Sequence, residues 1–113
     1  MSKFLEKVAL YMEDAKKIGI KVDEAKLTLV TKGLGPSIYK ADASTVAGSD
    51  KAELTRIKEN FLIKKLGLKD GKELDDAIAE AIKTMGTANR NKHRALVYYL
   101  LAEKFNKFSV YSK

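Results

Sequence analysis

Two neighbouring segments in the middle of the chain carry the same order of helix signals. Each begins with an aspartate and, three residues later, a glutamate (Asp50–Glu53 and Asp70–Glu73), and each ends at a glycine, Gly67 or Gly86. Acid pairs at this spacing before an apolar run are typical of a helix N-terminus, and a glycine supplies the left-handed residue that often ends a helix. The second segment has a regular apolar stripe: Leu74, Ile78, Ala81, Ile82 and Met85. The sequence therefore predicts two helices that each bury one face.

Two more helices are predicted in the first third of the chain. Residues 3–18 repeat apolar side chains with helical spacing after a candidate N-cap at Ser2, and Gly19 ends that helix. Residues 23–32 keep a similar spacing behind a candidate cap at Asp23, but they also alternate in polarity like a strand. We favour the helix because no partner strand is evident elsewhere in the chain.

The last predicted helix begins within residues 87–91 and ends near Lys104. It is apolar around so much of its circumference that we expect it to be the central and most buried helix. The tail that follows, residues 106–113, either packs back on the domain or contacts a partner. Its apolar side chains are Phe108, Val110 and Tyr111.

A stretch without helical periodicity separates the second and third helices. Residues 33–49 hold the only proline, Pro36, and three of the seven glycines. A connection of this length is uncommon, since most connections run to about 4–6 residues. The helices on both sides belong to one core, so the sequence predicts a single all-α domain, residues 1–113, of about five helices with one long ordered loop.

That loop is one candidate site. Ser37, Tyr39 and Lys40 place two hydroxyls and a cation in it, where they could form the wall of a binding site. The glycines do not follow the spacing of a phosphate-binding loop, and no strand precedes them. The alternative is a loop that packs on itself through its own apolar side chains, which are Leu34, Ile38, Tyr39 and Val46.

The positive charge of the chain is concentrated at its end. The formal net charge is +7, and residues 83–113 carry seven Lys and Arg against Glu103 alone, which gives +6. Such an asymmetry is typical of a face that binds polyanions, although it also serves solubility.

The densest part of this basic end is a second candidate site. Arg90, Lys92, His93 and Arg94 lie where the last helix is predicted to begin, and a helix N-terminus favours anions. We therefore take these four residues as candidate anion-binding residues, for a nucleic acid or a phosphate ligand. Two alternatives stay open: these cations are simply solvated, or they pair with acids of other helices. Candidate acids are Glu73, Asp76 and Glu80.

The composition excludes several kinds of site. The chain has no cysteine, which removes disulfides, thiol nucleophiles and zinc sites that need thiolates. His93 is the only histidine, and neither a calcium-type ligand spacing nor a Ser-His-Asp arrangement is evident. We therefore expect no metal, no cofactor and no catalytic residue. An enzyme stays open only with a concave pocket near Tyr39, Lys40 or Arg94.

The sequence also favours a soluble, cytoplasmic protein with no membrane partner. The first residues place a glutamate, Glu6, where a signal peptide needs an uninterrupted apolar run. The longest strongly apolar run, Ala95–Ala102, is far shorter than the roughly 20 residues that span a bilayer.

A helix-turn-helix motif is rejected for residues 77–100. The motif needs an apolar residue on its second helix facing the first, and the chain has Lys92 at that position. The connection through Gly86 is also longer than the 3–4 residues that the motif uses, on the usual geometry.

Three stretches resemble a known family. They are Gly-Leu-Gly-Pro-Ser-Ile-Tyr-Lys-Ala-Asp-Ala-Ser (33–44), Asn-Phe-Leu-Ile-Lys-Lys-Leu-Gly-Leu (60–68) and Asn-Arg-Asn-Lys-His-Arg-Ala-Leu-Val-Tyr-Tyr-Leu-Leu (89–101). The chain is similar over nearly its whole length to a family of small bacterial proteins classed as a domain of unknown function, the one numbered twenty-eight fifty-three. The resemblance implies a stand-alone bacterial cytoplasmic domain of this size, and it implies no activity, cofactor or site residue.

We therefore expect a non-enzymatic binding module with a basic face for an anionic partner. The alternative is a protein-partner or self-association module that uses the 33–50 loop and the aromatic tail. The sequence leaves the oligomeric state open.

Overall fold

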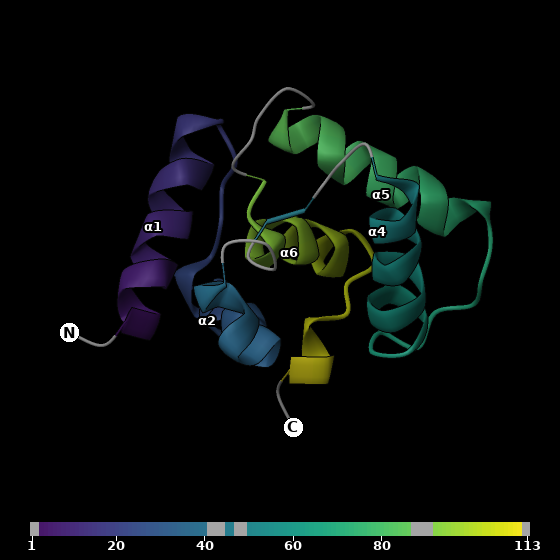
Figure 1. Cartoon of the computed structure of the whole chain (residues 1–113), viewed down its shortest axis with the longest axis horizontal. Coiled ribbons are helices and arrows are strands. Elements are labelled where there is room, and N and C mark those ends of the chain that lie inside the picture. The colour runs from purple at the N-terminus through teal and green to yellow at the C-terminus, as the bar shows by residue number, and fades with distance from the viewer. Residues whose placement is uncertain (1–2, 41–44, 47–49, 87–91, 112–113) are drawn as a thin grey trace.

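One helix at the centre organises the fold (Figure 1). α6 (Arg94–Lys104) is surrounded by α1 (Lys3–Lys17), α2 (Glu24–Leu34), α4 (Lys51–Arg56) and α5 (Lys72–Met85). The computed structural model describes residues 3–40, 45–46, 50–86 and 92–111, apart from the side chains of residues 36, 37 and 109. Within these ranges no strand forms, and the only pairing of that kind is an isolated bridge. The prediction of an all-α single domain with about five helices is confirmed.

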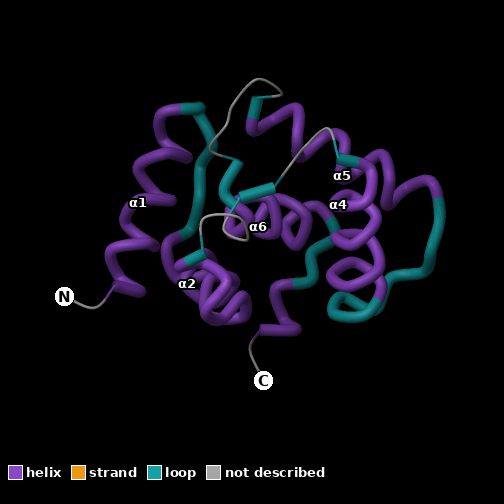
Figure 2. Tube along the Cα trace, in the orientation of Figure 1, coloured by secondary structure: helices purple, strands orange, loops and turns teal. Residues whose placement is uncertain are grey.

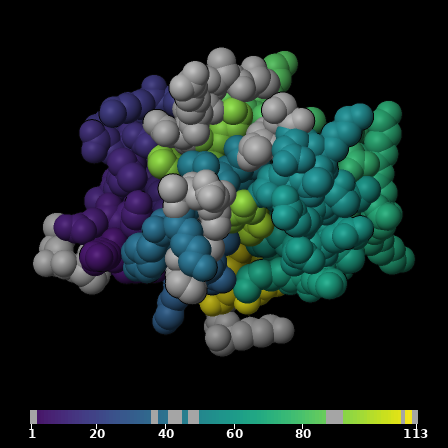
Figure 3. Space-filling view, in the orientation of Figure 1, coloured from purple at the N-terminus to yellow at the C-terminus, as the bar shows by residue number. Residues whose placement is uncertain are grey.

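α6 is the most buried helix, as its sequence predicts. Six of its 11 residues are buried: Ala95, Leu96, Val97, Tyr99, Leu101 and Ala102. In the space-filling view it is visible only in small yellow-green patches between the neighbouring elements (Figure 3). Full burial of a Leu or Val side chain contributes about 1.5–3 kcal/mol to the free energy of folding. The Tyr99 hydroxyl also accepts a hydrogen bond from the Asp23 amide at 2.9 Å, which joins the start of α2 to the middle of α6.

The predicted start of α6 is wrong. The helix begins at Arg94, later than the predicted 87–91, and His93 before it has non-helical backbone angles, φ −57 and ψ 127. The physical reason is a long-range pairing: the Val46 amide donates to the Lys92 carbonyl at 2.8 Å, and Thr45 forms a bridge with His93. Because the chain is extended at this point, Lys92 and His93 precede the helix.

α1 and α2 form as their spacing predicts. Residues 24–34 are a helix, which settles the choice between helix and strand. The Asp23 carboxylate accepts hydrogen bonds from the amides of Ala25 and Lys26, at 2.9 and 3.3 Å. This cap satisfies amides that have no partner within the helix. The predicted cap of α1 at Ser2 lies outside the described residues.

The third predicted helix contains a change of register. Asp50 caps α4 through the amides of Ala52 and Glu53, but from Ile57 to Ile63 the chain is a π-helix. The wider turns allow the adjacent residues Phe61 and Leu62 both to face the core, at 2% and 0% exposure. The segment ends as predicted, at a left-handed Gly67 (φ 73), with Leu68 donating to the Leu62 carbonyl.

The predicted cap of α5 is wrong. Its N-cap is Gly71, without a side-chain hydrogen bond, and Asp70 does not cap the helix. The Asp70 carboxylate instead contacts the Lys58 ammonium at 2.8 Å, and the same ammonium contacts Asp75 at 3.1 Å. The predicted end at Gly86 (φ 95) is confirmed.

The irregular loop is shorter than predicted. Gly33 is still helical, and α2 ends at Leu34. Its C-cap is Gly35, whose φ of 66 and ψ of −147 lie outside the α region, as expected before Pro36. A 3₁₀ segment, Gly35–Tyr39, follows. Ile38 and Val46 are buried at 2% and 4%, which supports a loop packed by its own apolar residues.

The tail packs back on the domain. Asn106 adopts a left-handed φ of 54, and Lys107 donates to the Ala102 carbonyl, so the chain reverses after α6. A 3₁₀ segment, Phe108–Tyr111, then lies against α2 (Figure 1). Of the two alternatives for the tail, packing on its own domain is the one that forms.

Candidate functional site

The two candidate sites from the sequence meet in space. Residues 45–46 of the loop lie against residues 92–94, where the chain enters α6 (Figure 2). Besides the backbone pairing, the Arg94 guanidinium donates to the Thr45 carbonyl at 3.4 Å. We call this region, Thr45 and Val46 with Lys92, His93 and Arg94, the junction.

His93 is paired with an acid from α1. Its Nε2 lies 2.5 Å from Oδ2 of Asp14, and its side chain is 9% exposed. One face of the imidazole ring packs on Tyr11, with ring centroids 4.8 Å apart. Because an acid already occupies this edge of the ring, His93 has one ring nitrogen committed within the fold.

Arg94 is paired with an acid from α4. The guanidinium contacts Oε1 of Glu53, whose other oxygen contacts Arg56 at 3.2 Å. It also donates to the Tyr98 hydroxyl at 3.2 Å and lies 5.7 Å from the centre of that ring, which stacks on Phe61. Burial alone would lower the pKa of Arg94, but the hydrogen bonds and charges of Tyr98 and Glu53 outweigh it and raise the pKa.

Asp14 and Glu53 compensate the positive electrostatic potential at the N-terminus of α6. The N-terminus of α6 is a positive end with no side-chain cap, and cations there are unfavourable by about 0.3–1 kcal/mol when exposed. Asp14 and Glu53 bring negative charge to that end from α1 and α4. The interpretation that these residues pair with acids of other helices is therefore confirmed for Arg94, and the His93 ring likewise contacts an acid, Asp14. The acids differ from the three expected, of which Glu80 pairs with Lys104 at 2.7 Å.

The other sequence-predicted residues differ in how far they are exposed. Lys92 is 7% exposed, and Arg90 lies outside the described residues. In the loop, Tyr39 is 47% exposed and Lys40 is also exposed, while the side chain of Ser37 lies outside the described part. The self-packing interpretation included Tyr39 among the residues that pack the loop, and this part of the prediction is wrong.

Tyr11 carries a polar atom that the fold leaves unsatisfied. The side chain is 1% exposed, and among the described groups its hydroxyl has no hydrogen-bond partner. Burial, with a smaller contribution from the charge of Tyr39, raises the pKa of Tyr11 to about 12. A buried hydroxyl without a partner costs about 1–3 kcal/mol, so Tyr11 is a weak point beside the His93–Asp14 pair.

A second basic region, which sequence analysis missed, surrounds the tail. The Lys26 ammonium lies 5.0 Å from the centre of the Phe108 ring, and the Lys65 ammonium lies 4.9 Å from that of Tyr111. Lys107 directly precedes the two rings in sequence. Within the part of the chain that the structure describes, none of these lysines pairs with a carboxylate. We call these five residues the tail surface.

Gly33 makes the approach of the tail possible. A Cβ at this position would lie 2.8 Å from Cε1 of the Tyr111 ring, closer than side chains pack. Burial raises the pKa of Tyr111, whose ring is covered by α2 and Lys65. Phe108 and Tyr111 are three residues apart, which places both rings on one side of a 3₁₀ turn. This spacing is the feature of the sequence that could have indicated the tail surface.

Two hollows are open on the surface. One, of about 550 Å³, is lined by Met12, Glu13, Lys16, Ile20, Lys21 and Val22. The other, of about 250 Å³, lies between α5 and α6. Neither of these two is lined by Tyr39, Lys40 or Arg94, the residues near which the enzyme alternative would need a pocket. Among the described residues, no group of three or more His, Asp or Glu side chains is arranged to hold a metal.

These features define a small helical domain whose central helix begins in a charge-paired junction. The chain belongs to the family described as "Protein of unknown function (DUF2853)", whose model matches residues 10–109. The resemblance noted from the sequence is confirmed. No curated protein matches the chain. None of the described helices combines the length and apolar character that a membrane crossing requires.

Proposed function

We propose that the protein is a non-enzymatic module that binds single-stranded nucleic acid through a basic face, and that this face is the tail surface. The observation that supports the proposal is the difference between the two basic regions. His93 and Arg94 at the junction are paired with Asp14 and Glu53, whereas Lys26 and Lys65 lie over aromatic rings and none of the three tail-surface lysines has a described carboxylate partner. An anionic partner would meet less competition at the tail surface.

The chemistry of the tail surface suits a phosphate backbone. Lysine ammonium groups bind phosphates as point charges, and an aromatic ring beneath such a group holds it in place without neutralising it. Phe108 and Tyr111 are only partly buried, so part of each side chain is exposed for contact with sugars or bases. Arg90, a candidate anion-binding residue from the sequence, lies outside the described residues and is not part of this face. Lys92, His93 and Arg94 are assigned the supporting role of holding the loop against α6.

The test is a titration with a short, labelled, single-stranded oligonucleotide, read by fluorescence anisotropy. Three lysines in contact with phosphates predict a slope of log K against log salt of about −2, since each contact with a single strand contributes about −0.7. The variant Lys26→Gln/Lys65→Gln/Lys107→Gln should lose most of this binding.

A matched control separates location from net charge. The variant Lys69→Gln/Lys72→Gln/Lys83→Gln also removes three positive charges from the formal +7, so both variants stand at +4. The proposal expects the control to keep the affinity of the wild-type protein to within about threefold, because its lysines lie elsewhere. Equal losses in the two variants, or no binding by the wild-type protein at low salt, would contradict it.

A second candidate function is self-association through the loop. The observation that favours it is Tyr39, a large aromatic side chain that is 47% exposed although the adjacent Ile38 is buried. Light scattering over a range of concentrations tests it: the wild-type protein should gain mass with concentration, and Tyr39→Ser should not. A mass that stays at one chain throughout would rule out this function.

A further inference from the structure

We infer that the hollow beside α1 is a docking groove for an acidic amphipathic helix of a partner protein. This surface is separate from the tail surface, and the inference goes beyond the binding of nucleic acid proposed above. It rests on the shape of the groove, on the apolar stripe that extends it and on the charge at its rim.

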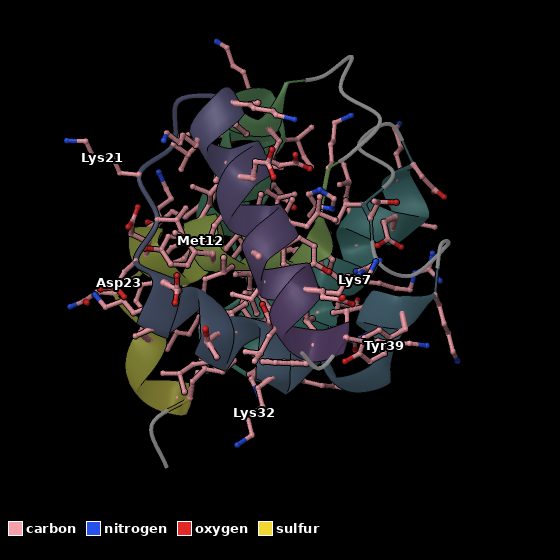
Figure 4. The ribbon with its side chains drawn as sticks, turned by 90° about the vertical axis from the view of Figure 1, so that its left-hand side faces the viewer. Lys7, Met12, Lys21, Asp23, Lys32 and Tyr39 are labelled. Atoms are coloured by element: carbon pink, nitrogen blue, oxygen red, sulfur yellow. The ribbon has the colours of Figure 1, made fainter. Side chains whose placement is uncertain are left out.

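The groove is an apolar trough between two parts of the chain. Met12 lies on α1, and Ile20 and Val22 lie on the connection that leads to α2. All three are partly exposed and pack against the core from the outside. Figure 4 shows Met12 on the side of α1 that faces this connection, with Lys7 and Tyr39 on the opposite side of the helix. The volume of about 550 Å³ is large enough for several side chains of a partner.

An exposed apolar stripe continues the groove along α1. Leu5 is 50% exposed, and it lies seven residues, or two helical turns, before Met12. Residues seven apart share a helix face, and the exposed Ala9 lies between them. The core-facing side of α1 is occupied by other residues: Val8, Tyr11 and Ala15. The groove and Leu5 thus form one apolar strip about two turns long, which is the length over which a helix presents residues i, i+4 and i+7.

The rim of the groove is positive. Lys16 and Lys21 flank it, and in the described part of the chain neither forms an ion pair. Lys21 projects into solvent (Figure 4). The acid at the rim, Glu13, lies 3.9 Å from Lys17, so its charge is offset within α1. A partner helix with leucines on one face and glutamates beside them would match both the apolar strip and the two lysines.

The experiment uses a designed peptide as the probe. The peptide carries leucines at i, i+4 and i+7 and glutamates at the flanking positions, and its binding to the full chain is measured by calorimetry. The variant Lys16→Glu/Lys21→Glu should bind this peptide at least about tenfold more weakly, because two attractive charge pairs become repulsive. A peptide with lysine in place of glutamate should show the reverse preference.

Controls make each outcome decisive. Lys64→Glu/Lys83→Glu changes the net charge equally at exposed positions away from the groove, and it should leave the affinity unchanged to within about twofold. The methyl resonance of Met12 should shift on binding while that of the buried Met85 does not. No binding of the acidic peptide, equal losses in the two double variants, an unshifted Met12, or a second copy of the chain occupying the groove would each overturn the inference.

Discussion

The junction and the tail surface are both basic, but their basic side chains contact different groups, carboxylates at the junction and aromatic rings at the tail surface. At the junction, two carboxylates from distant parts of the chain contact the basic side chains: Asp14 is 79 residues from His93, and Glu53 is 41 residues from Arg94. At the tail surface, Lys26 and Lys65 lie over aromatic rings. The comparison teaches that the number of cations in a segment does not identify a binding face. What matters is which groups the fold places against them.

Depth explains the difference. The junction is covered by α1 and α4, and a buried cation that lacked a partner there would be strongly destabilising. The tail surface lies at the edge of the domain, where water solvates the ammonium groups and pairing is not required. Substitutions that break the pairing at the junction should therefore destabilise the protein more than substitutions at the tail surface.

The largest effect is expected from removing one carboxylate at the junction. Glu53→Gln leaves the Arg94 side chain, which is 16% exposed, without its charge partner. Breaking a buried pair in this way should lower the free energy of unfolding by roughly 3 kcal/mol. Urea denaturation followed by circular dichroism measures it.

The matched control is an exposed pair of the same chemistry. Glu80 contacts Lys104 at 2.7 Å, but the two side chains are 65% and 43% exposed. Glu80→Gln should therefore cost less than about 1 kcal/mol. If the two substitutions destabilise the protein equally, the junction pair has no special structural role.

The next prediction concerns Tyr11 beside the junction. In the folded protein its pKa is raised from the ordinary 10.0 to about 12, so between these values the folded state holds a proton that the unfolded state has released. Stability should fall as pH rises through this range, by up to about 2 kcal/mol from this residue.

Tyr11→Phe isolates this contribution from the other tyrosines. The variant should lose less stability than the wild-type protein between pH 10 and 12, the range in which the phenol titrates. At neutral pH it should equal or exceed the wild-type protein by about 1 kcal/mol, because an unsatisfied hydroxyl is removed. A variant less stable at neutral pH by several kcal/mol would show that the hydroxyl has a partner.

A smaller effect is expected where the tail meets α2. Gly33→Ala places a Cβ 2.8 Å from the Tyr111 ring, so the tail must shift. The helix itself gains up to about 1 kcal/mol from alanine, and undocking of the tail costs roughly 1–2 kcal/mol. Hydrogen exchange at residues 108–111 should accelerate about tenfold, because docking is weakened.

Gly71→Ala is the comparison for this substitution. Nothing lies within 4 Å of a Cβ at Gly71, and its φ of 172 is ordinary extended backbone. The exchange of the tail should not change in this variant. Unchanged exchange in Gly33→Ala as well would mean that the tail is not held by this contact.

The smallest effects are expected for the single tail-surface lysines. Lys26→Gln and Lys65→Gln each remove a cation from an aromatic ring, and each should lower stability by only about 0.5–1 kcal/mol. Thermal denaturation alongside Lys72→Gln, a lysine without such a ring, checks the difference. Losses above about 2 kcal/mol would show that these lysines are structural, as the junction cations are.

Local signals in the sequence predicted most helix boundaries. Asp23, Asp50, Gly67 and Gly86 act as their residue types suggest, because capping depends on a few neighbouring residues. Asp70 failed as a cap for a non-local reason, the competing ammonium of Lys58. The start of α6 failed in the same way, since residues 45–46 hold residues 92–93 in an extended form.

The sites were less predictable than the fold. The sequence indicated a cluster of cations at 90–94 and suggested pairing as one alternative, but nothing local points to Asp14 or Glu53 as the acids. The tail surface combines α2, the turn after the π-helical segment and residues 107–111, so it exists only after folding. Both the junction and the tail surface are defined by contacts between side chains that lie far apart in the sequence.

Whether the tail surface, and not the junction, binds nucleic acid is tested most directly by the salt dependence of oligonucleotide binding in two variants. Arg94→Gln removes a junction cation, and Lys26→Gln/Lys65→Gln/Lys107→Gln removes the tail-surface cations. Below the melting range of both variants, Arg94→Gln should keep a slope near −2 despite its lower stability, while the slope of the tail variant should approach zero. A slope lost in Arg94→Gln and kept in the tail variant would show that the junction, and not the tail surface, binds the oligonucleotide.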